Sequence, residues 1–309
     1  MYRLNFTTIT PLHISNGEIL DQNFHYVTLR DKFYKLDQFK TATLIAKKEN
    51  IDFSEEITVQ KIESWIKNYQ LELLENATSY SVKIHPNFEA HLQNAEANGR
   101  RQVIEFIQSN GKFYVPASSI KGAMLTPLGI HLLGIDPKHP KIEDRVVFAD
   151  SDYIPSERFS VYRTENRPPE NNIICLDPDN TFSLIMRKKG NLDKNKFFDS
   201  IKRYTKIQLD NLQKEVFQDK SQKLGKLRKA DLFLLSIKPI VEMVEKGKVL
   251  FNIGYGGGSW FKINQDKIPK FKSKVPGQKE WEAAHSSYSF TLQGSLRHIG
   301  WCTVEIEDI

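Results

Sequence analysis

Four glycines lie within five positions of this chain, at Gly254, Gly256, Gly257 and Gly258, although the whole sequence of 309 residues has only 16 glycines. Ordering glycine costs backbone entropy, so a cluster indicates a sharp turn or a close approach to another group. No Gly-Lys-Ser/Thr follows, as a Walker A loop requires, and the spacing differs from a dinucleotide fingerprint. The bare N–H groups of such a loop could line a phosphate or a ribose.

Aromatic and basic residues follow these glycines directly. Tyr255 lies within the loop, and Trp260, Phe261 and Lys262 come immediately after it. Aromatic rings can stack on nucleic-acid bases while a lysine meets a phosphate. We expect Tyr255 or Trp260 to stack on a base and Lys262 to contact a phosphate. A glycine-rich bulge without a ligand would give the same sequence.

The stretch "VPASSIKGA", Val115 to Ala123, places Ser118, Ser119, Lys121 and Gly122 at the start of a predicted helix that follows a strand. The first N–H groups of a helix have no partner within it, and the helix dipole favours an anion there. Lys121 would add a positive charge. We therefore predict an anion site, with a serine cap and a solvated lysine as the alternative.

Two histidines flank the predicted first and last strands. In "TPLHISNGE", Thr10 to Glu18, His13, Asn16 and Gly17 follow the first strand, and Arg297 and His298 begin the last one. The two histidines could lie near the same edge if the two halves face each other. A plain turn with a half-buried His13 beneath it explains the first motif equally well.

Conventional enzyme motifs are missing from the sequence. There is no HExxH, no CxxC and no GxSxG. Asp150 and Asp152 could share a strand face, but such a pair is more often a turn at a strand end than a metal site. Cys175 and Cys302 are too few for a disulfide framework or a four-cysteine zinc site. We predict no metal and no cofactor.

Charge and composition favour a cytoplasmic protein with a polyanionic partner. The net charge is +6, and two stretches, residues 220–229 and 262–279, are rich in lysine. A run of lysines is often only a solvated face, but lysines beside aromatic residues are typical of single-stranded nucleic-acid binding. There is no stretch of 18 apolar residues, and the first residues lack the features of a signal peptide.

Hydrophobic periodicity and turn residues predict strands and helices in an alternating order. The predicted strands cover residues 2–9, 24–37 (two strands turning at 30–32), a hairpin around 109–111, 145–151, 171–188 (two strands) and 300–307. The predicted helices cover residues 58–76, a segment beginning at 118, 193–218 and 230–245.

This order predicts an α+β fold of two ferredoxin-like (RRM-like) domains with antiparallel sheets and a C-terminal glycine-rich loop. The predicted domains are residues 1–145 and residues 146–309, the second carrying the glycine-rich loop.

Five stretches in order resemble motifs of the RAMP (repeat-associated mysterious protein) superfamily of CRISPR effector subunits. "TPLHISNGE" looks like its Pro-Leu-His-Ile-Gly-x-Gly motif, and "VPASSIKGA" like its Ile-Pro-Gly-Ser-Ser-Leu-Lys-Gly-Ala motif. "FADSD" is similar to its central Val-x-Asp-Ser strand, "GYGGGSWFK" to its glycine-rich loop and "RHIGWCTVEIE" to its closing strand. Ser15 and Ala117 stand where the family usually has glycine, which reduces how closely the backbone can approach RNA there.

The combination looks most like the fifth subunit of the Csm-type, type III-A complex. The resemblance implies a non-catalytic subunit that binds crRNA, caps its 3′ side, assists its 3′-end maturation in antiviral defence, and contacts neighbouring backbone and small subunits. Target RNA is a possible further partner. The residues expected to contact RNA are His13, Asn16, Gly17, Ser118, Ser119, Lys121, Gly122, Gly254, Tyr255, Gly256, Gly257, Gly258, Trp260, Lys262 and Arg297.

Two other functions fit the sequence. Related RAMP proteins cut precursor crRNA without metal and use a histidine. In such an endoribonuclease, His13 or His298 would take a proton from a 2′-OH and Lys121 would stabilise the developing charge. The other alternative is an assembly subunit with little RNA contact.

Overall fold

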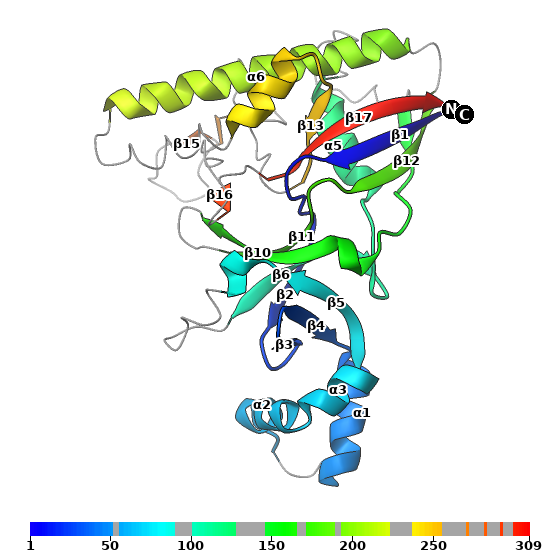
Figure 1. The fold of residues 1–309 in the computed structure, drawn as a ribbon, viewed down its shortest axis with the longest axis vertical. Helices are drawn as coiled ribbons and strands as arrows, with labels where there is room; N and C mark the ends of the chain where they lie inside the picture. The colour runs from blue at the N-terminus through cyan, green and yellow to red at the C-terminus, as the bar shows by residue number, and fades with distance from the viewer. Residues whose placement is uncertain are drawn as a thin grey trace.

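A computed structural model of the chain has an α+β fold, built on two β-sheets with helices at both ends of the molecule (Figure 1). The structure describes residues 1–51, 56–89, 101–127, 146–165, 171–188, 193–222, 237–254, 270–271, 281–282, 291–292 and 299–309.

The first sheet has five strands in the order β13-β17-β1-β12-β9, and every neighbouring pair is antiparallel. Its strands are β1 (Tyr2–Thr8), β9 (Val146–Phe148), β12 (Thr181–Lys188), β13 (Leu250–Asn252) and β17 (Trp301–Asp308).

The central strand of this sheet is β1, the first strand of the chain, and it forms where the sequence predicts a strand. In β1, Tyr2, Leu4 and Phe6 alternate with more exposed residues and are buried, so one face of the strand enters the core. The ring of Phe6 stacks on that of Phe182 at 5.0 Å between centroids. Because β17 pairs with β1, the two ends of the chain lie together (Figure 1).

The second sheet is mixed. It has eight strands in the order β2-β6-β11-β10-β5-β4-β3, with β16 pairing with β10. Its strands are β2 (Ser15–Asp21), β3 (Tyr26–Leu29), β4 (Lys32–Leu36), β5 (Thr78–Ile84), β6 (Gln102–Phe106), β10 (Phe159–Glu165), β11 (Asn172–Leu176) and β16 (Thr291–Leu292). The prediction of antiparallel sheets is wrong here, because β5 runs parallel to β10 and β6 runs parallel to β11.

Each sheet takes strands from both sides of residue 145. The first sheet combines β1 with four strands from the later part of the chain, and the second combines β2 to β6 with β10, β11 and β16. The predicted division at residue 145 is therefore not a division between the sheets. Two short ladders complete the strands: β7 (Gln108–Ser109) with β8 (Lys112–Phe113), and β14 (Lys270–Phe271) with β15 (Trp281–Glu282).

The predicted tight turns are confirmed by the backbone. Asn110 and Gly111 have φ angles of 50° and 76° and join β7 to β8, as the Asn-Gly step predicts. Arg30 has a φ of 55° between β3 and β4. Asp179 has a φ of 61° in the turn from β11, in the second sheet, to β12, in the first.

Three helices lie at the end of the molecule beyond β3 and β4 (Figure 1): α1 (Gln38–Glu49), α2 (Val59–Asn68) and α3 (Gln70–Asn76). The single helix predicted over residues 58–76 is two helices, since Tyr69 between them has φ −102° and ψ 16°. Thr58 caps α2 by accepting a hydrogen bond from the Lys61 N–H at 3.3 Å. Trp65, Ile66 and Leu73 belong to a separate core beneath these helices.

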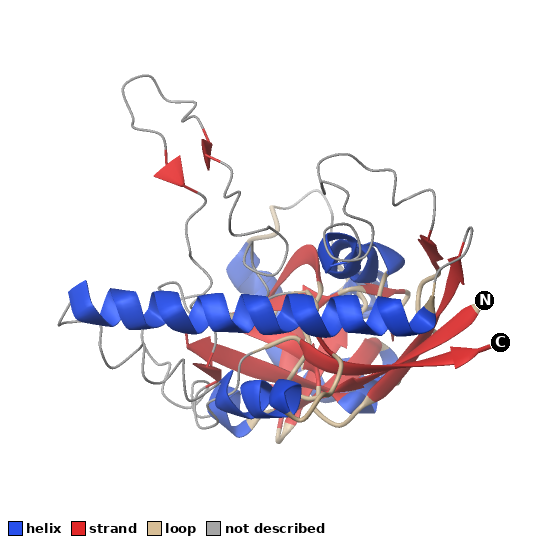
Figure 2. Ribbon diagram, turned by 90° about the horizontal axis from the view of Figure 1, so that it is seen from above, coloured by secondary structure: helices blue, strands red, loops and turns tan. Residues whose placement is uncertain are grey.

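At the opposite end, α5 (Ala117–Pro127), the long α6 (Lys194–Gln222) and a helix over residues 237–245 accompany the first sheet (Figures 1 and 2). Phe197 and Ile201 of α6 join the main core, which spans both sheets. Further along α6, Leu209 packs with Ile240 and with Trp301 of β17. No helix in the described part of the chain is long and apolar enough to cross a membrane.

Candidate nucleic-acid interface

The first glycine of the glycine-rich loop lies against the first motif. Gly254 has a φ of 73°, and a Cβ atom placed on it would collide with the carbonyl oxygen of His13 and lie 2.9 Å from Cγ1 of Ile14. Gly254 follows β13 directly, and β13 is held by its pairing with β17. Only glycine fits this position without displacing the backbone.

The beginning of the last strand contacts both the first motif and the residue before Gly254. The Gly300 N–H donates to the carbonyl of Pro11 at 2.8 Å, and the Ile253 N–H donates to the carbonyl of Gly300 at 2.8 Å. The Trp301 N–H donates to the hydroxyl of Thr10 at 2.9 Å. Three motifs that are far apart in sequence therefore converge at one edge of the first sheet. The structure does not test the closeness of His13 and His298, because His298 lies outside the described residues.

His13 is buried beneath this junction, with an exposed fraction of 0%. Its Nδ1 lies 2.6 Å from the carbonyl oxygen of Ile174, which only accepts, so Nδ1 carries the proton of a neutral ring. Burial lowers the pKa of His13 to about 4, and the hydrogen bond to Ile174 opposes this only in part. The side chain is a buried neutral group that positions the turn, and it has no surface with which to contact RNA.

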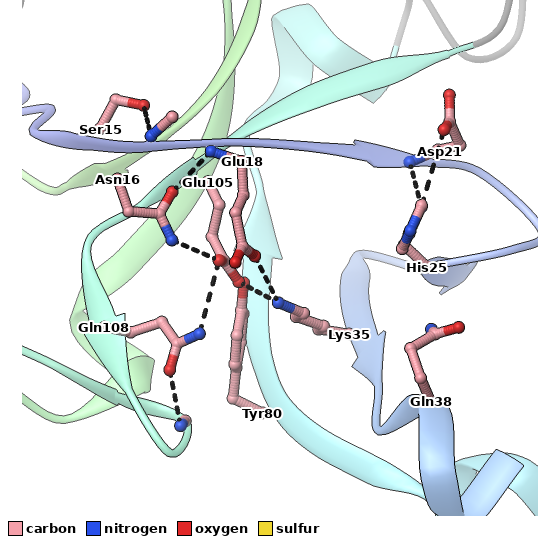
Figure 3. Close-up of polar contacts among 12 residues, drawn as sticks. Ser15, Asn16, Glu18, Asp21, His25, Lys35, Gln38, Tyr80, Glu105 and Gln108 are labelled. Carbon is pink, nitrogen blue, oxygen red and sulfur yellow. Dashed lines mark hydrogen bonds and ion pairs between the residues drawn. The ribbon is translucent and has the colours of Figure 1, made fainter.

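The exposed part of the first motif is the turn from Ser15 to Glu18 at the start of β2. Gly17 has a φ of 91° and donates its N–H to the Ser15 hydroxyl at 2.8 Å. Asn16 accepts from the Glu18 N–H at 2.9 Å through its side chain (Figure 3). Ser15, which replaces the glycine usual in the family, is thus part of the turn itself.

The buried carboxylate of Glu105 fixes the side chain of Asn16. The side-chain nitrogen of Asn16 donates to Glu105 at 2.9 Å, and Glu105 also accepts from Lys35 at 2.6 Å and from the Tyr80 hydroxyl at 2.7 Å (Figure 3). These residues come from β2, β6, β4 and β5, so the network joins four strands of the second sheet. The Glu105 side chain is 0% exposed and that of Lys35 is 13% exposed.

Charge pairing decides the ionisation of this carboxyl group. Burial alone would raise the pKa of Glu105, but the hydrogen bonds from Lys35, Tyr80 and Asn16 and the charge of Lys35 together hold it below its usual value. The sequence did not predict this network. The signal that could have found it is the inward-facing alternation of Val103 and Glu105 in β6, which places a charge on the core side.

The second motif forms the start of α5, as predicted, but a serine does not cap it. The Ala117 N–H donates to Oδ1 of Asp150 at 2.7 Å, so a carboxylate from outside the helix occupies the first free donor. Ser118 is exposed, whereas Ser119 and Lys121 are half-buried. Gly122 has open space around the position of a Cβ atom. Asp150 is therefore a helix cap, and no group of acidic, histidine or cysteine residues in the described part of the chain could hold a metal ion.

The other predicted RNA-binding residues lie outside the described residues. They are Tyr255, Gly256, Gly257, Gly258, Trp260, Lys262 and Arg297, and the same holds for His298 of the endoribonuclease alternative. Of the candidate interface, the structure describes the turn at Ser15 to Glu18, Gly254 at the beginning of the glycine-rich stretch, and the start of α5.

Comparison with known proteins identifies the family. A family model described as the RAMP superfamily matches residues 5–262. A solved structure described as a Csm-crRNA-target RNA ternary complex in a type III-A CRISPR-Cas system contains a similar chain, with a TM-score of 0.63, 13% identity, and 99% and 100% of the two chains covered. Csm5 from T. onnurineus has a TM-score of 0.57 and 13% identity, covering 97% of this chain and 99% of its own. No curated protein matches the sequence. Because the family model spans most of its length, this chain belongs to the RAMP superfamily.

Proposed function

We propose that this protein is a crRNA-binding, non-catalytic subunit of a type III-A (Csm) CRISPR effector complex. The observation that carries this proposal is the match of fold over the whole length of both chains, 99% and 100%, to a chain of a Csm-crRNA-target RNA complex. The second match, to Csm5, supports the place of the fifth subunit. We propose that the protein caps the 3′ side of the crRNA there and assists its 3′-end maturation, as the resemblance of its motifs implies.

The buried junction of motifs supports RNA binding by the residues that emerge from it. Gly254 anchors the glycine-rich loop beside the turn of the first motif, and the start of the last strand is bonded to the same turn. Tyr255 directly follows Gly254 in the sequence, and Arg297 comes three residues before Gly300. We propose that the loop and these residues hold single-stranded RNA, with Tyr255 or Trp260 stacked on bases and Lys262 on phosphate.

The start of α5 supplies a second contact in this proposal. Ser118 is exposed and Lys121 is half-buried on the first turns of the helix, where the dipole favours an anion. The carboxylate of Asp150 opposes a phosphate there. We propose that Lys121 offsets this charge when RNA binds.

The neighbouring backbone and small subunits, with target RNA, are the further proposed partners, and the cytoplasm is the proposed location. Two ferredoxin-like (RRM-like) domains, residues 1–145 and residues 146–309, remain a prediction. The buried, neutral state of His13 favours a binder over an endoribonuclease, because a proton-transferring histidine must reach the 2′-OH of its substrate.

Filter binding of the purified chain to a labelled crRNA, across salt concentrations and without metal, tests this function. We expect salt-dependent binding and intact RNA on a gel afterwards. Lys121→Gln should weaken binding to all RNA sequences alike and reduce the salt slope by about one. The matched control is Lys40→Gln, which removes the same charge from an exposed position on α1.

Shortened RNA would contradict the non-catalytic proposal. In that case His13→Ala and His298→Ala would show whether either histidine carries the cleavage. Binding that is weak and insensitive to salt would contradict RNA binding itself.

A further inference from the structure

A row of polar residues crosses the second sheet on the face opposite the main core. Lys32 of β4 is directly opposite Lys83 of β5, and Lys83 is the partner of Ser160 in β10. The neighbours of these residues along each strand, Phe33, Val82 and Val161 among them, are buried in the main core. Because side chains alternate along a strand, the row itself points to the other face.

Two lysines placed opposite each other are unfavourable for the protein alone. Both Lys32 and Lys83 are exposed, and within the described residues neither lies within ion-pair distance of a carboxylate. Like charges that face each other across a strand pair destabilise the sheet. An anion bound between them removes this repulsion, so the pair has the character of an anion site.

A carboxylate lies beside this pair in a fixed orientation. Asp177, which follows β11, accepts hydrogen bonds from the Ser160 and Tyr162 hydroxyls, each at 2.9 Å. Burial raises the pKa of Asp177, although these hydrogen bonds and the charges of Lys83 and His85 oppose the rise. Asp177 is half-buried, and each of its carboxylate oxygens has room in its bonding capacity for a further hydrogen bond. An ionised carboxylate only accepts hydrogen bonds, and a ligand hydroxyl would suit it.

A histidine completes the row, and its ring is held on two sides. His85 stacks on Tyr162 at 4.5 Å between centroids with 28° between the ring planes. Its Nδ1 lies 2.8 Å from Oδ1 of Asn87, a buried residue whose Nδ2 donates to the carbonyl of Arg163 at 2.9 Å. That bond fixes which end of the amide is oxygen, so Nδ1 of His85 donates to Oδ1 of Asn87 in the shorter of its two contacts, and the Asn87 N–H approaches the same nitrogen at 3.4 Å. The two contacts and the stacking on Tyr162 give the half-exposed ring one orientation.

We propose that this outer-face row, formed by Lys32, Lys83, His85 and Asp177, binds the ribose-phosphate backbone of single-stranded RNA. A phosphate lies between the two lysines, the 2′-hydroxyl of the adjoining ribose donates to Asp177, and the ring of His85 packs against the nucleotide. A deoxyribose offers Asp177 no donor, so the row distinguishes RNA from DNA. The inference rests on the proposed function and specifies where the protein recognises the sugar.

Fluorescence anisotropy with three labelled oligomers of equal length tests the row on the full chain: oligouridine RNA, its 2′-O-methyl form and oligodeoxyuridine. The 2′-O-methyl form keeps an RNA-like sugar but has no hydroxyl proton to donate. We expect the wild type to bind the RNA about five-fold more tightly than either analogue, which is the size of one hydrogen bond. Lys83→Gln should weaken binding of all three oligomers several-fold and lower the salt slope by about one.

Asp177→Asn should remove most of the preference for RNA, while its affinity for the two analogues stays the same or rises. Lys40→Gln is again the matched control, and thermal unfolding of each variant checks that it is folded.

If the wild type binds RNA and Lys83→Gln behaves like Lys40→Gln, the row is not the site and the proposed function stands. If the preference for RNA is absent in the wild type or survives in Asp177→Asn, the role of Asp177 is wrong. If the wild type binds none of the oligomers, the proposed function and the row both fail.

Discussion

The carbonyl oxygen of His13 occupies the space in which any residue other than glycine at position 254 would carry its Cβ atom. The first glycine of the cluster therefore approaches the protein's own backbone. Its φ of 73° also belongs to the left-handed region that favours glycine. This contact ties Gly254, the first residue of the glycine-rich stretch, to the first motif.

Gly254→Ala should destabilise the protein by about 3 kcal/mol or more, because a left-handed alanine and a collision with backbone both oppose folding. Gly17→Ala is the matched control. Gly17 has a similarly positive φ of 91° but has nothing within 4 Å of its Cβ position, so it should lose only about 1 kcal/mol. Urea unfolding measures both. Equal losses would mean that the His13 carbonyl moves aside without cost.

The stability of the protein should fall with acidification because of His13. Its folded pKa, about 4, is below the unfolded value of 6.5, so the unfolded state binds the proton more readily and stability is lost as the pH falls from about 6.5 toward 4. Between about pH 7 and pH 5 this single group should cost about 2 kcal/mol. Urea unfolding of wild type and His13→Asn at both pH values gives the difference.

His25→Asn is the control for this measurement. The pKa of His25 is also lowered by burial, but the side chain is 29% exposed and keeps part of its contact with water. His25→Asn should therefore keep most of the pH dependence. A His13→Asn variant as sensitive to acid as the wild type would contradict the assignment.

Removing Lys35 should leave the carboxylate of Glu105 buried without its cation. Lys35→Met is expected to cost about 3–5 kcal/mol near neutral pH, whereas Lys35→Met combined with Glu105→Leu should recover part of this loss. Denaturant unfolding of the single and double variants measures the coupling. Additive losses would show that the 2.6 Å ion pair contributes no coupling energy.

The pH dependence of the same pair has a defined sign. The pKa of Glu105 is lower in the folded protein than in the unfolded chain, where it is near 4.3. The ionised Glu105 therefore stabilises the folded protein at pH values above the unfolded pKa, and this stabilisation is lost as the pH falls through the folded pKa. In Lys35→Met the carboxyl group prefers the protonated form. The gap in stability between wild type and Lys35→Met should therefore narrow below about pH 4.

Asp150 should affect both the helix and the binding of RNA. Asp150→Ala removes the acceptor for the Ala117 N–H and should destabilise the protein by about 1 kcal/mol. Asp150→Asn keeps an acceptor but removes the negative charge, so it should bind RNA more tightly if a phosphate lies at the start of α5. Asp152→Asn, an exposed acid two residues further on, is the control. Equal RNA affinity in both Asn variants would contradict an RNA contact at this helix.

Local patterns in the sequence were sufficient for many of the elements. The alternation of Tyr2, Leu4 and Phe6 predicted β1, and the Asn110-Gly111 step predicted the turn between β7 and β8. The position of α6 followed from its helical periodicity. These features depend on neighbours in the chain, and short-range preferences determine them. The break at Tyr69 between α2 and α3 was missed because both helices continue the same apolar periodicity.

The candidate site was predicted in its residue types but not in its contacts. The sequence placed Ser118 at the start of a helix, which agrees with the structure. It did not show that Asp150 caps that helix or that His13 is buried and neutral.

The sequence by itself determined the family, through five motifs in order, and the approximate position of strands such as β1, β12 and β17 and of the helix α6, but it missed α1, β2, β5 and β10. Only the tertiary structure decided which strands pair, that β5 and β6 run parallel to β10 and β11, and that Gly254 meets His13. The physical reason is that pairing and burial join residues far apart along the chain, and their free energies depend on neighbours that no local pattern specifies.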